Sequence, residues 1–284
     1  AYGTTKGGMR FLLRDIISNK TLFQRSDKPY VVMMGTNIIF NMDLNTIIDA
    51  HENSGAQMTV VYCKATHNVD DETKLQINEN GRLTGVSAGV VYGDNASMDC
   101  CIVNRETLLE IIDHYQAADY LDLLEALQGD FGNIDVCSYE YKGEVVGVFS
   151  EKSLYRRSMD LLDQTVADQL FDPERPILTK AHDVPPSRYA TGSHACNSII
   201  SAGCIIKGTV RNSILSRGVV VEEGASVTNS IINQSCIIKS GARVENAILD
   251  KNNVVPTNTE LRGTPENILV LGKAPLTSDT TIVR

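Results

Sequence analysis

The sequence lacks the features of several protein classes. No apolar run among its 284 residues approaches the roughly 18 residues of a membrane span, and no signal peptide opens it. It has no block of Lys and Arg, and its formal net charge is −9, so its electrostatics argue against a nucleic-acid-binding surface. We therefore expect a cytoplasmic protein that binds neither a membrane nor a nucleic acid.

The cysteines also lack a recognisable pattern. Seven of them are scattered along the chain, an odd number, and their spacing is not that of a zinc site. This usage predicts buried thiols in a reducing cytosol. The residues are Cys63, Cys100, Cys101, Cys137, Cys196, Cys204 and Cys236.

The stretch from Asn197 to Val255 repeats itself, and the rest of the chain is organised around it. The residues Asn-Ser-Ile-Ile that begin at Asn197 return, with small changes, at Asn212, Asn229 and Asn246, at spacings of 15, 17 and 17 residues. A fixed period is typical of a solenoid, whose coils bury their apolar faces by stacking. The β-branched residues, with Gly, Ser and Asn at the corners, suit short strands and tight turns. We predict a left-handed parallel β-helix of hexapeptide repeats with about four coils, rather than a sandwich of strands, which needs no fixed period.

The first half of the chain alternates strand and helix patterns. A strand over 30–34 is followed by a helix that Asp43 or Asn45 caps, and then by a second strand over 58–63. Strand, helix and strand form a βαβ unit, which predicts a parallel sheet with right-handed crossovers. Ligands of such sheets lie beyond the carboxyl ends of the strands, so we expect the chemistry at the loop 35–37.

The remaining patterns divide the chain into two domains and a linker. Four prolines exclude helix from much of 172–189, where the composition shifts. We expect a mixed α/β domain at 1–165, a proline-rich linker at 166–190, and the β-helix with its tail at 191–284. A strand in the tail, at 267–270, is expected to cap the open end of the solenoid. Further helices are predicted at 106–114, 120–127 and 153–163, strands at 83–92, 136–141 and 144–149, and a polar hairpin or loop at 70–80.

Three short motifs, in this order and followed by a β-helix, resemble the sugar-nucleotide pyrophosphorylases. Residues 36–43, Thr-Asn-Ile-Ile-Phe-Asn-Met-Asp, match the frame of the family's G-D-x-x-Y-x-M-D. Residues 96–99 resemble A-S-M-G, and residues 157–162 resemble A-N-M-D-L-L. The sequence is most similar to the glucose-1-phosphate adenylyltransferase family, which implies a nucleotidyltransferase-like, Rossmann-like domain before the β-helix.

The chain departs from this family at the positions that carry the chemistry. Nucleotidyl transfer needs Mg²⁺, which binds carboxylate oxygens. The family's metal-binding Asp falls on Asn37, the acid of its S-H-D-F-G on Asp122, and the acid of its W-x-D-V-G-T on Gly147. Residues 83–89 lack the Lys of F-x-E-K-P, and the opening G-G-x-G-x-R-L phosphate loop is absent, so we expect that a first segment is missing from the chain. We expect Asn37, Asp122 and Gly147 to be degenerate active-site positions, with no catalytic, cofactor-binding or metal-binding residue in this chain.

In these losses the chain resembles the non-catalytic, regulatory GlgD-type subunits of the family. It also resembles them at residues 139–141, 159–162 and 182–186. The resemblance implies a heterotetramer with a catalytic glucose-1-phosphate adenylyltransferase subunit. That partner would bind Mg²⁺ and make ADP-glucose and diphosphate from ATP and glucose 1-phosphate for glycogen. Lys180 and Arg188 in the linker are candidate ligands of a small anionic effector, although a solvated face is the commoner explanation.

Three other functions stay open. The chain could be an active adenylyltransferase that uses unusual metal ligands. It could be a hexapeptide-repeat acyltransferase, which uses a His in a coil as general base, but the coils from 197 to 255 contain no His. A purely structural scaffold would leave the βαβ frame of the first domain unexplained.

Overall fold

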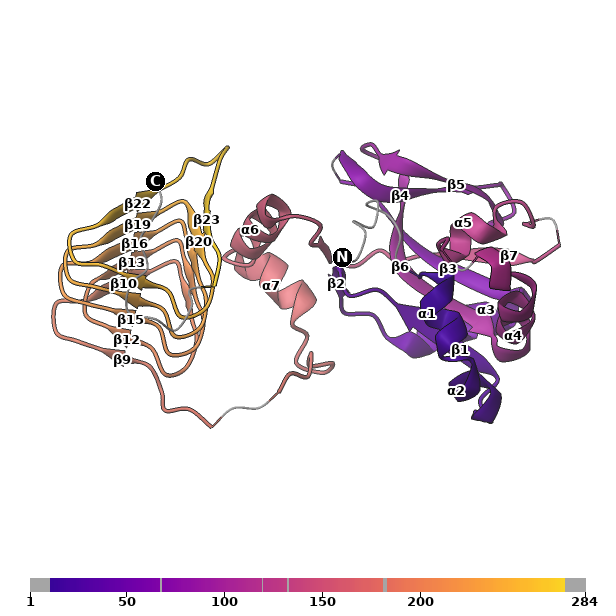
Figure 1. Ribbon diagram of the computed structural model, residues 1–284, viewed down its shortest axis with the longest axis horizontal. Coiled ribbons are helices and arrows are strands. Elements are labelled where there is room, and N and C mark those ends of the chain that lie inside the picture. Colours follow the sequence, from indigo (N-terminus) through magenta and orange to yellow (C-terminus); the bar gives the residue numbers. More distant parts are fainter. Residues whose placement is uncertain (1–10, 67, 119, 132, 181–182, 274–284) are drawn as a thin grey trace. The chain divides into compact units, whose positions relative to one another are not determined.

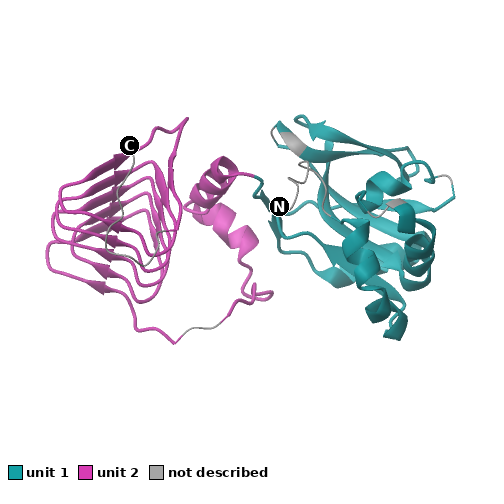
Figure 2. Ribbon diagram, in the orientation of Figure 1, with its two compact units in different colours: residues 1–149 teal, residues 150–284 magenta. Residues whose placement is uncertain are grey.

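The computed structural model describes residues 11–273 except 67, 119, 132, 181 and 182 (Figure 1). The chain divides into two compact units between Phe149 and Ser150 (Figure 2). No described helix is long and apolar enough to cross a membrane.

A mixed sheet forms the centre of the first unit. Among the described residues, six strands pair in the order β5-β4-β6-β3-β7, with β1 also paired to β6. Strand β6 is buried along almost its whole length, including the polar residues Ser97 and Asp99. The strands are β1 (Tyr30–Met34), β3 (Met58–Lys64), β4 (Val69–Ile77), β5 (Leu83–Val90), β6 (Asn95–Asn104) and β7 (Val136–Glu140).

The prediction of a parallel sheet is wrong because of the position of β6. This strand lies between β1 and β3 and is antiparallel to both, with Ile102 opposite Val32 on one side and Thr59 on the other. The two strands of the βαβ unit therefore run in the same direction without touching, and β3 pairs in parallel with β7 instead. The expected hairpin at 70–80 is confirmed, because β4 pairs antiparallel with β5, and β4 also borders β6 at Ala96. The sequence pattern of β1, α3 and β3 does not reveal that β6, a later strand, lies between β1 and β3.

A side-chain cap begins two helices of the first unit, α3 and α5. The Asp43 carboxylate accepts from the N–H of Asn45 at 2.9 Å and begins α3, which ends at Gly55 with a φ of 64°. His51 anchors α3 to the sheet, because its buried ring lies 2.8 Å from the Thr59 hydroxyl and 3.0 Å from the Asn104 amide oxygen. The helices are α1 (Leu13–Ser18), α2 (Lys20–Arg25), α3 (Leu44–Ser54), α4 (Arg105–His114), the 3₁₀ turn η1 (Gln116–Ala118) and α5 (Leu123–Leu127).

The second unit contains the predicted parallel β-helix. Its strands stack in three five-stranded parallel sheets, and the inward side chains form one apolar core. The tail strand β23 pairs with β20, which confirms the strand expected near 267–270. The strands are β9 (Arg188–Tyr189), β10 (His194–Cys196), β11 (Ile199–Ile200), β12 (Ile205–Ile206), β13 (Thr209–Arg211), β14 (Ile214–Leu215), β15 (Val220–Val221), β16 (Ser226–Thr228), β17 (Ile231–Ile232), β18 (Ile237–Ile238), β19 (Arg243–Glu245), β20 (Ala247–Leu249), β21 (Val254–Val255), β22 (Glu260–Arg262) and β23 (Leu269–Leu271).

The repeated Asn and Ser each have a separate role at one corner of the coil. Asn197, Asn212, Asn229 and Asn246 adopt φ values between 42° and 50°, a left-handed conformation that Asn tolerates better than most residues. The serines that follow form a hydrogen-bonded ladder from coil to coil. The Ser213 hydroxyl donates to the Arg211 carbonyl at 2.6 Å and accepts from the N–H of Ser230 at 3.1 Å. The Ser230 hydroxyl repeats this arrangement with the Thr228 carbonyl and the N–H of Ala247.

Removing this ladder should weaken the β-helix. We expect Ser213→Ala or Ser230→Ala to lower the free energy of unfolding by about 2 kcal/mol each, because a buried N–H and a carbonyl lose their partner. Denaturant unfolding followed by circular dichroism measures this loss. The outward Ser226 provides a matched control, and Ser226→Ala should change stability by less than about 0.5 kcal/mol. Equal losses at all three serines would contradict a specific role for the ladder.

Two helices begin the second unit, and the first of them packs with the β-helix. They are α6 (Glu151–Asp160) and α7 (Gln164–Leu170). The Tyr155 hydroxyl of α6 donates to the Asn229 carbonyl at 2.7 Å, and its ring packs with Ile231 and Ile248. The compact units consequently divide before α6, earlier than the position 165 expected from composition.

The cysteines are free thiols with different exposures. Cys100, Cys101, Cys204 and Cys236 are buried. Cys63 and Cys137 are half-buried, and Cys196 is exposed, so the expectation of buried thiols is wrong at Cys196, which points outward from β10.

Candidate functional site

The structure brings together Asn37 and Gly147, which are far apart in the sequence. Short strands β2 (Ile38–Phe40) and β8 (Val145–Gly147) pair in antiparallel register, with Ile38 opposite Gly147. Next to this pair, the N–H of Val148 donates to the Asn37 carbonyl at 2.7 Å. Two positions at which the family motifs have acids are thus neighbours here, and both are uncharged.

An aromatic ring occupies the space beside Gly147. A Cβ at this position would lie 2.5 Å from a ring carbon of Phe149 and 3.4 Å from a carboxylate oxygen of Glu72. An acidic side chain at 147 would therefore require the Phe149 ring to move. The family's W-x-D-V-G-T has an acid and then a glycine at these two positions, whereas this chain has Gly147 and then Phe149.

Glu72 is an acid at this place that sequence reasoning missed. It lies in β4, within the stretch that was expected to be a hairpin or loop, and it reaches Gly147 only through the tertiary structure. Burial, and secondly the Glu72 charge, raise the pKa of the nearby Cys63 thiol to about 11. Cys63 is therefore a protonated, unreactive thiol at neutral pH.

Asp122 has a structural environment of its own. It is 5% exposed and begins α5, where one carboxylate oxygen accepts from the N–H of Leu124 at 2.9 Å. The other oxygen accepts from the N–H of Phe11 at 2.7 Å, and Leu12 forms a bridge with Asp122. The carboxylate thereby joins the segment before α1 to α5. Because Asp122 caps the helix, α5 starts later than the helix predicted at 120–127.

Asp122 also lines a cavity of about 240 Å³ together with Asp99. Asp99 is 5% exposed and has a φ of 47°, and its carbonyl accepts from the N–H of Gly35 at 2.7 Å. No Lys, Arg or His is among the described residues around this cavity, although a bound phosphate group would favour a cation. The lining residues are Phe11, Thr73, Val86, Ser87, Ala88, Ser97, Asp99, Asp122, Leu124, Glu125 and Gln128.

The residues at these positions do not fit a Mg²⁺ site. Asn37 offers a neutral amide, Gly147 offers no side chain, and both oxygens of Asp122 accept backbone N–H groups. Within the described parts of the chain, no group of three or more His, Cys, Asp or Glu side chains is placed to hold a metal ion.

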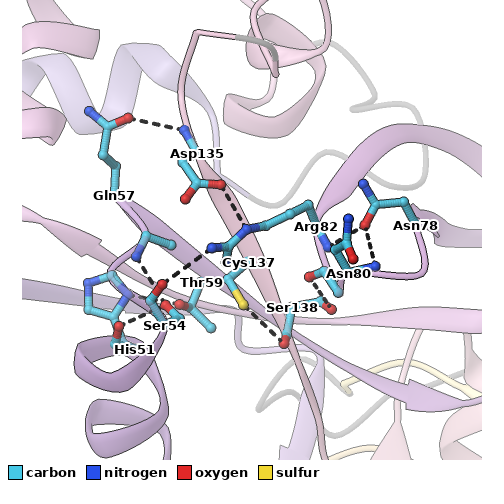
Figure 3. Close-up of polar contacts among 12 residues, drawn as sticks. His51, Ser54, Gln57, Thr59, Asn78, Asn80, Arg82, Asp135, Cys137 and Ser138 are labelled. Atoms are coloured by element: carbon cyan, nitrogen blue, oxygen red, sulfur yellow. Dashed lines mark hydrogen bonds and ion pairs between the residues drawn. The ribbon is translucent and has the colours of Figure 1, made fainter.

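A polar cluster at the other end of the strands has a structural role (Figure 3). The Arg82 guanidinium forms an ion pair with Asp135 at 3.0 Å and donates to the Ser54 carbonyl at 3.3 Å. Gln57 accepts from the N–H of Asp135 at 3.0 Å. Gln57 and Asp135 directly precede β3 and β7, so this cluster lies where those strands begin, whereas ligands of open α/β sheets bind beyond the ends of strands.

Both units of the chain resemble parts of known proteins. Residues 184–267 match the family described as GlmU-like, C-terminal hexapeptide. The chain is 31% identical to the glycogen biosynthesis protein GlgD of Bacillus subtilis, over 88% of this chain and 64% of that protein. It is 30% identical to GlgD of Geobacillus stearothermophilus, over 72% of this chain and 51% of that protein. The glucose-1-phosphate adenylyltransferase of Corynebacterium jeikeium is also 30% identical, over 75% of this chain and 59% of that enzyme.

The chain spans between about half and two thirds of the length of these relatives. The match to Bacillus subtilis GlgD covers most of the chain. The chain is therefore similar, over most of its length, to GlgD and to glucose-1-phosphate adenylyltransferase.

Proposed function

We propose that this chain is a regulatory or helper subunit of glucose-1-phosphate adenylyltransferase in glycogen biosynthesis. Its catalytic partner converts ATP and glucose 1-phosphate to ADP-glucose and diphosphate, and this chain raises or regulates that activity. The observation that carries the proposal is the neutral pair Asn37 and Gly147, side by side, with the Phe149 ring where an acidic side chain would begin.

The charge of the reaction explains why this pair matters. A sugar phosphate approaches the α-phosphate of ATP, and Mg²⁺ held by carboxylates offsets the crowded negative charge. Losing that metal site removes several kcal/mol of transition-state stabilisation, which corresponds to a rate loss of roughly 10³-fold or more. The structural role of Asp122 and the absence of a cation among the described residues of its cavity support the same conclusion.

The partner supplies what this chain lacks. Mg²⁺ binds to the catalytic subunit, and the two kinds of chain assemble as a heterotetramer. Lys180 and Arg188 are exposed, and a small anionic effector is proposed to bind near them. The Mg²⁺ site of the partner and the heterotetramer are proposed from the family, and the effector site is proposed from the chemistry of Lys180 and Arg188.

An active adenylyltransferase with unusual ligands is a second candidate, and Glu72 favours it. Its carboxylate lies 3.4 Å from the position of a Cβ at Gly147, so it could replace the missing acid of the metal site. Glu72→Gln separates the two candidates. It should remove any ADP-glucose synthesis by the isolated chain if Glu72 binds the metal, and it should leave the stimulation of the catalytic subunit intact if our proposal holds.

The decisive measurement is ADP-glucose formation by the full-length protein alone, by the catalytic subunit alone, and by the two mixed. We expect no synthesis by this protein alone, at least roughly 10³-fold below the catalytic subunit. We expect the mixture to be faster, or to bind substrate more tightly, than the catalytic subunit by itself. Normal turnover and Mg²⁺ dependence of the isolated protein would disprove the proposal.

Two controls sharpen this result. The triple variant Asn37→Asp, Gly147→Asp and Phe149→Gly restores both acids and removes the ring that blocks one of them. Calorimetric titration with Mg²⁺ should show binding to this variant and none to a Gly147→Asp single variant, in which the Phe149 ring still occupies the site.

A protein that makes no ADP-glucose alone and leaves the rate of the mixture unchanged should be assayed with acetyl-CoA, since the acyltransferase alternative would then gain support.

A further inference from the structure

The first unit contains a groove that shares no lining residue with the cavity at Asp122. This groove, which we call the α4 groove, has a volume of about 320 Å³, within the range of pockets that hold small molecules. One wall belongs to α4 and to Tyr115, the residue after it, and a second wall belongs to the segment 130–134 before β7. Gln57, which directly precedes β3, also lines the groove.

Helix α4 turns one face to this groove. The lining residues of the helix are three or four positions apart and therefore share a face, and they are Thr107, Glu110, Ile111 and His114. Thr107 and Ile111 are buried, whereas Glu110 and His114 are exposed. The core thus fixes the base of the groove, and the side chains of Glu110 and His114 stay accessible to a ligand.

Asp130 holds the second wall in place. The Tyr115 hydroxyl donates to one oxygen of its carboxylate, and the Asn133 amide donates to the other oxygen at 3.1 Å. These two bonds, and to a smaller extent the nearby His114, lower the pKa of Asp130, so its carboxylate is charged at neutral pH. The His114 ring meets the Tyr115 ring edge-on, with the ring centroids 4.8 Å apart. Asp130 therefore positions Tyr115 and Asn133, and its own charge is already balanced by two donors.

Three other side chains of the groove have hydrogen-bonding groups to offer a ligand. The Gln57 amide oxygen accepts from the N–H of Asp135 at 3.0 Å, and in Figure 3 its amide nitrogen points away from that bond. The side chains of Glu110 and His114 form no hydrogen bond with another residue in the parts of the chain that the structure describes. Gln57 can therefore donate, Glu110 can accept, and a neutral His114 ring can do both.

The charges of the groove argue against an anionic ligand. The carboxylates of Glu110 and Asp130 line it, and no Lys or Arg is among the lining residues that the structure describes. Lys20 and Arg82 are the cations of neighbouring ion pairs, and neither of them lines the groove. A phosphate group favours a cation, so a sugar phosphate or a nucleotide does not fit. A cationic ligand would pair with Glu110, which is exposed to water, where an ion pair contributes little.

We propose that the α4 groove binds an uncharged sugar. The hydroxyl groups of a sugar both donate and accept hydrogen bonds, as the side chains of Gln57, Glu110 and His114 together do. The C–H face of a sugar ring is apolar, and Ile134 and the Tyr115 ring provide an apolar surface for it.

The position of the groove indicates an effector rather than a substrate. Gln57 lies at the beginning of β3, whereas Cys63, whose pKa the Glu72 charge raises, lies near the other end of this strand. A strand of 7 residues spans roughly 20 Å, so the bound sugar is far from Glu72 and Gly147. The inference goes beyond the proposed function, because the sugar binds this chain without the catalytic subunit.

Calorimetric titration of the full-length protein with three sugars of the same ring tests this inference. Glucose is neutral, glucuronate carries a carboxylate, and glucosamine carries an ammonium group at slightly acidic pH. We expect a dissociation constant on the order of 1 mM for glucose, and binding at least about 10-fold weaker for glucuronate, whose charge meets Glu110 and Asp130. Glucosamine that binds about 10-fold or more tightly than glucose would assign the groove to a cation and overturn the inference.

Variants of α4 locate the bound sugar. Glu110→Ala and His114→Ala should each weaken glucose binding by about 5-fold or more, because each removes a hydrogen bond to a hydroxyl group. Glu106→Ala is the matched control, since it makes the same change on the same helix at an exposed residue that does not line the groove, and it should leave binding unchanged. Glu110 is exposed and Ala favours helix, so Glu110→Ala stays folded, which its unfolding midpoint checks.

Maltose distinguishes two sources of the sugar. Tighter binding of maltose than of glucose supports the inference and identifies the end of a glucan chain, and equal binding supports it with a single free sugar as the ligand. Absence of binding by both sugars would overturn the inference, as would equal glucose binding by the folded Glu110→Ala, His114→Ala and Glu106→Ala proteins. Because these titrations contain no catalytic subunit, either result leaves the proposed function standing.

Discussion

Gly208→Ala is expected to destabilise the β-helix by about 3 kcal/mol or more, since the added methyl group has no space. A Cβ at this position would overlap the carbonyl oxygen of Ala225 and lie 2.6 Å from that of Glu222. Both contacts are with backbone of the next coil, which cannot move aside as a side chain can. The Ala225 carbonyl also accepts the N–H of Thr209 at 2.9 Å, so displacing it would break a hydrogen bond between coils.

Gly272→Ala is the matched control for this prediction. A Cβ on Gly272 would meet no atom within 4 Å, and the residue does not adopt a positive φ. We therefore expect a change of less than about 0.5 kcal/mol in the free energy of unfolding. Denaturant unfolding of both variants, followed in the far ultraviolet, measures the difference. A Gly208→Ala protein as stable as the Gly272→Ala protein would show that the coils can separate at this corner.

Asp122→Ala should lower the free energy of unfolding by about 3 kcal/mol. Its two oxygens accept from the N–H groups of Phe11 and Leu124, and hydrogen bonds to a charged group contribute more than neutral ones. Without the carboxylate, α5 loses its cap and the segment before α1 loses its connection to α5. Asp122→Asn keeps an oxygen that accepts one of these bonds, and about half of the loss should remain.

Asp43→Ala separates the loss of a helix cap from the loss of the bond between Asp122 and Phe11. Asp43 caps α3 through the same kind of bond, to the N–H of Asn45 at 2.9 Å, but its hydrogen bond is exposed to solvent. We expect it to cost about 1 kcal/mol, the usual value for a lost cap. Similar losses for Asp43→Ala and Asp122→Ala would show that the link to Phe11 contributes nothing. Mg²⁺ should not raise the unfolding midpoint of the unchanged protein relative to Asp122→Asn, since Asp122 acts through backbone N–H groups.

The degenerate positions show where reasoning from motifs stops. The family frames identify Asn37, Asp122 and Gly147 as equivalent members of one site. In the structure Asn37 and Gly147 are neighbours across β2 and β8, while Asp122 belongs to a separate set of contacts with Phe11 and Leu124. Glu72 joins the first pair through β4. These groupings depend on pairings between distant strands, which short motifs do not encode.

The sequence by itself determined the features that repeat or act locally. The period of Asn-Ser-Ile-Ile specifies the β-helix because each copy contains its own left-handed corner, and the first three copies each contain a serine hydroxyl that accepts from the next coil. Asp43 predicts the start of α3 for a similar reason, since a cap and the N–H it accepts are two residues apart.

Only the tertiary structure decided the features that join distant residues. The insertion of β6 between β1 and β3, the Phe149 ring over Gly147 and the bond from Phe11 to Asp122, 111 residues away, each bring together segments with no common local pattern. Because α6 packs with Ile231 and Ile248, the second compact unit begins at Ser150, before the boundary that composition predicted. Such contacts form because burying apolar surface and pairing buried polar groups stabilise the whole chain, and neither term can be evaluated within a short window of sequence.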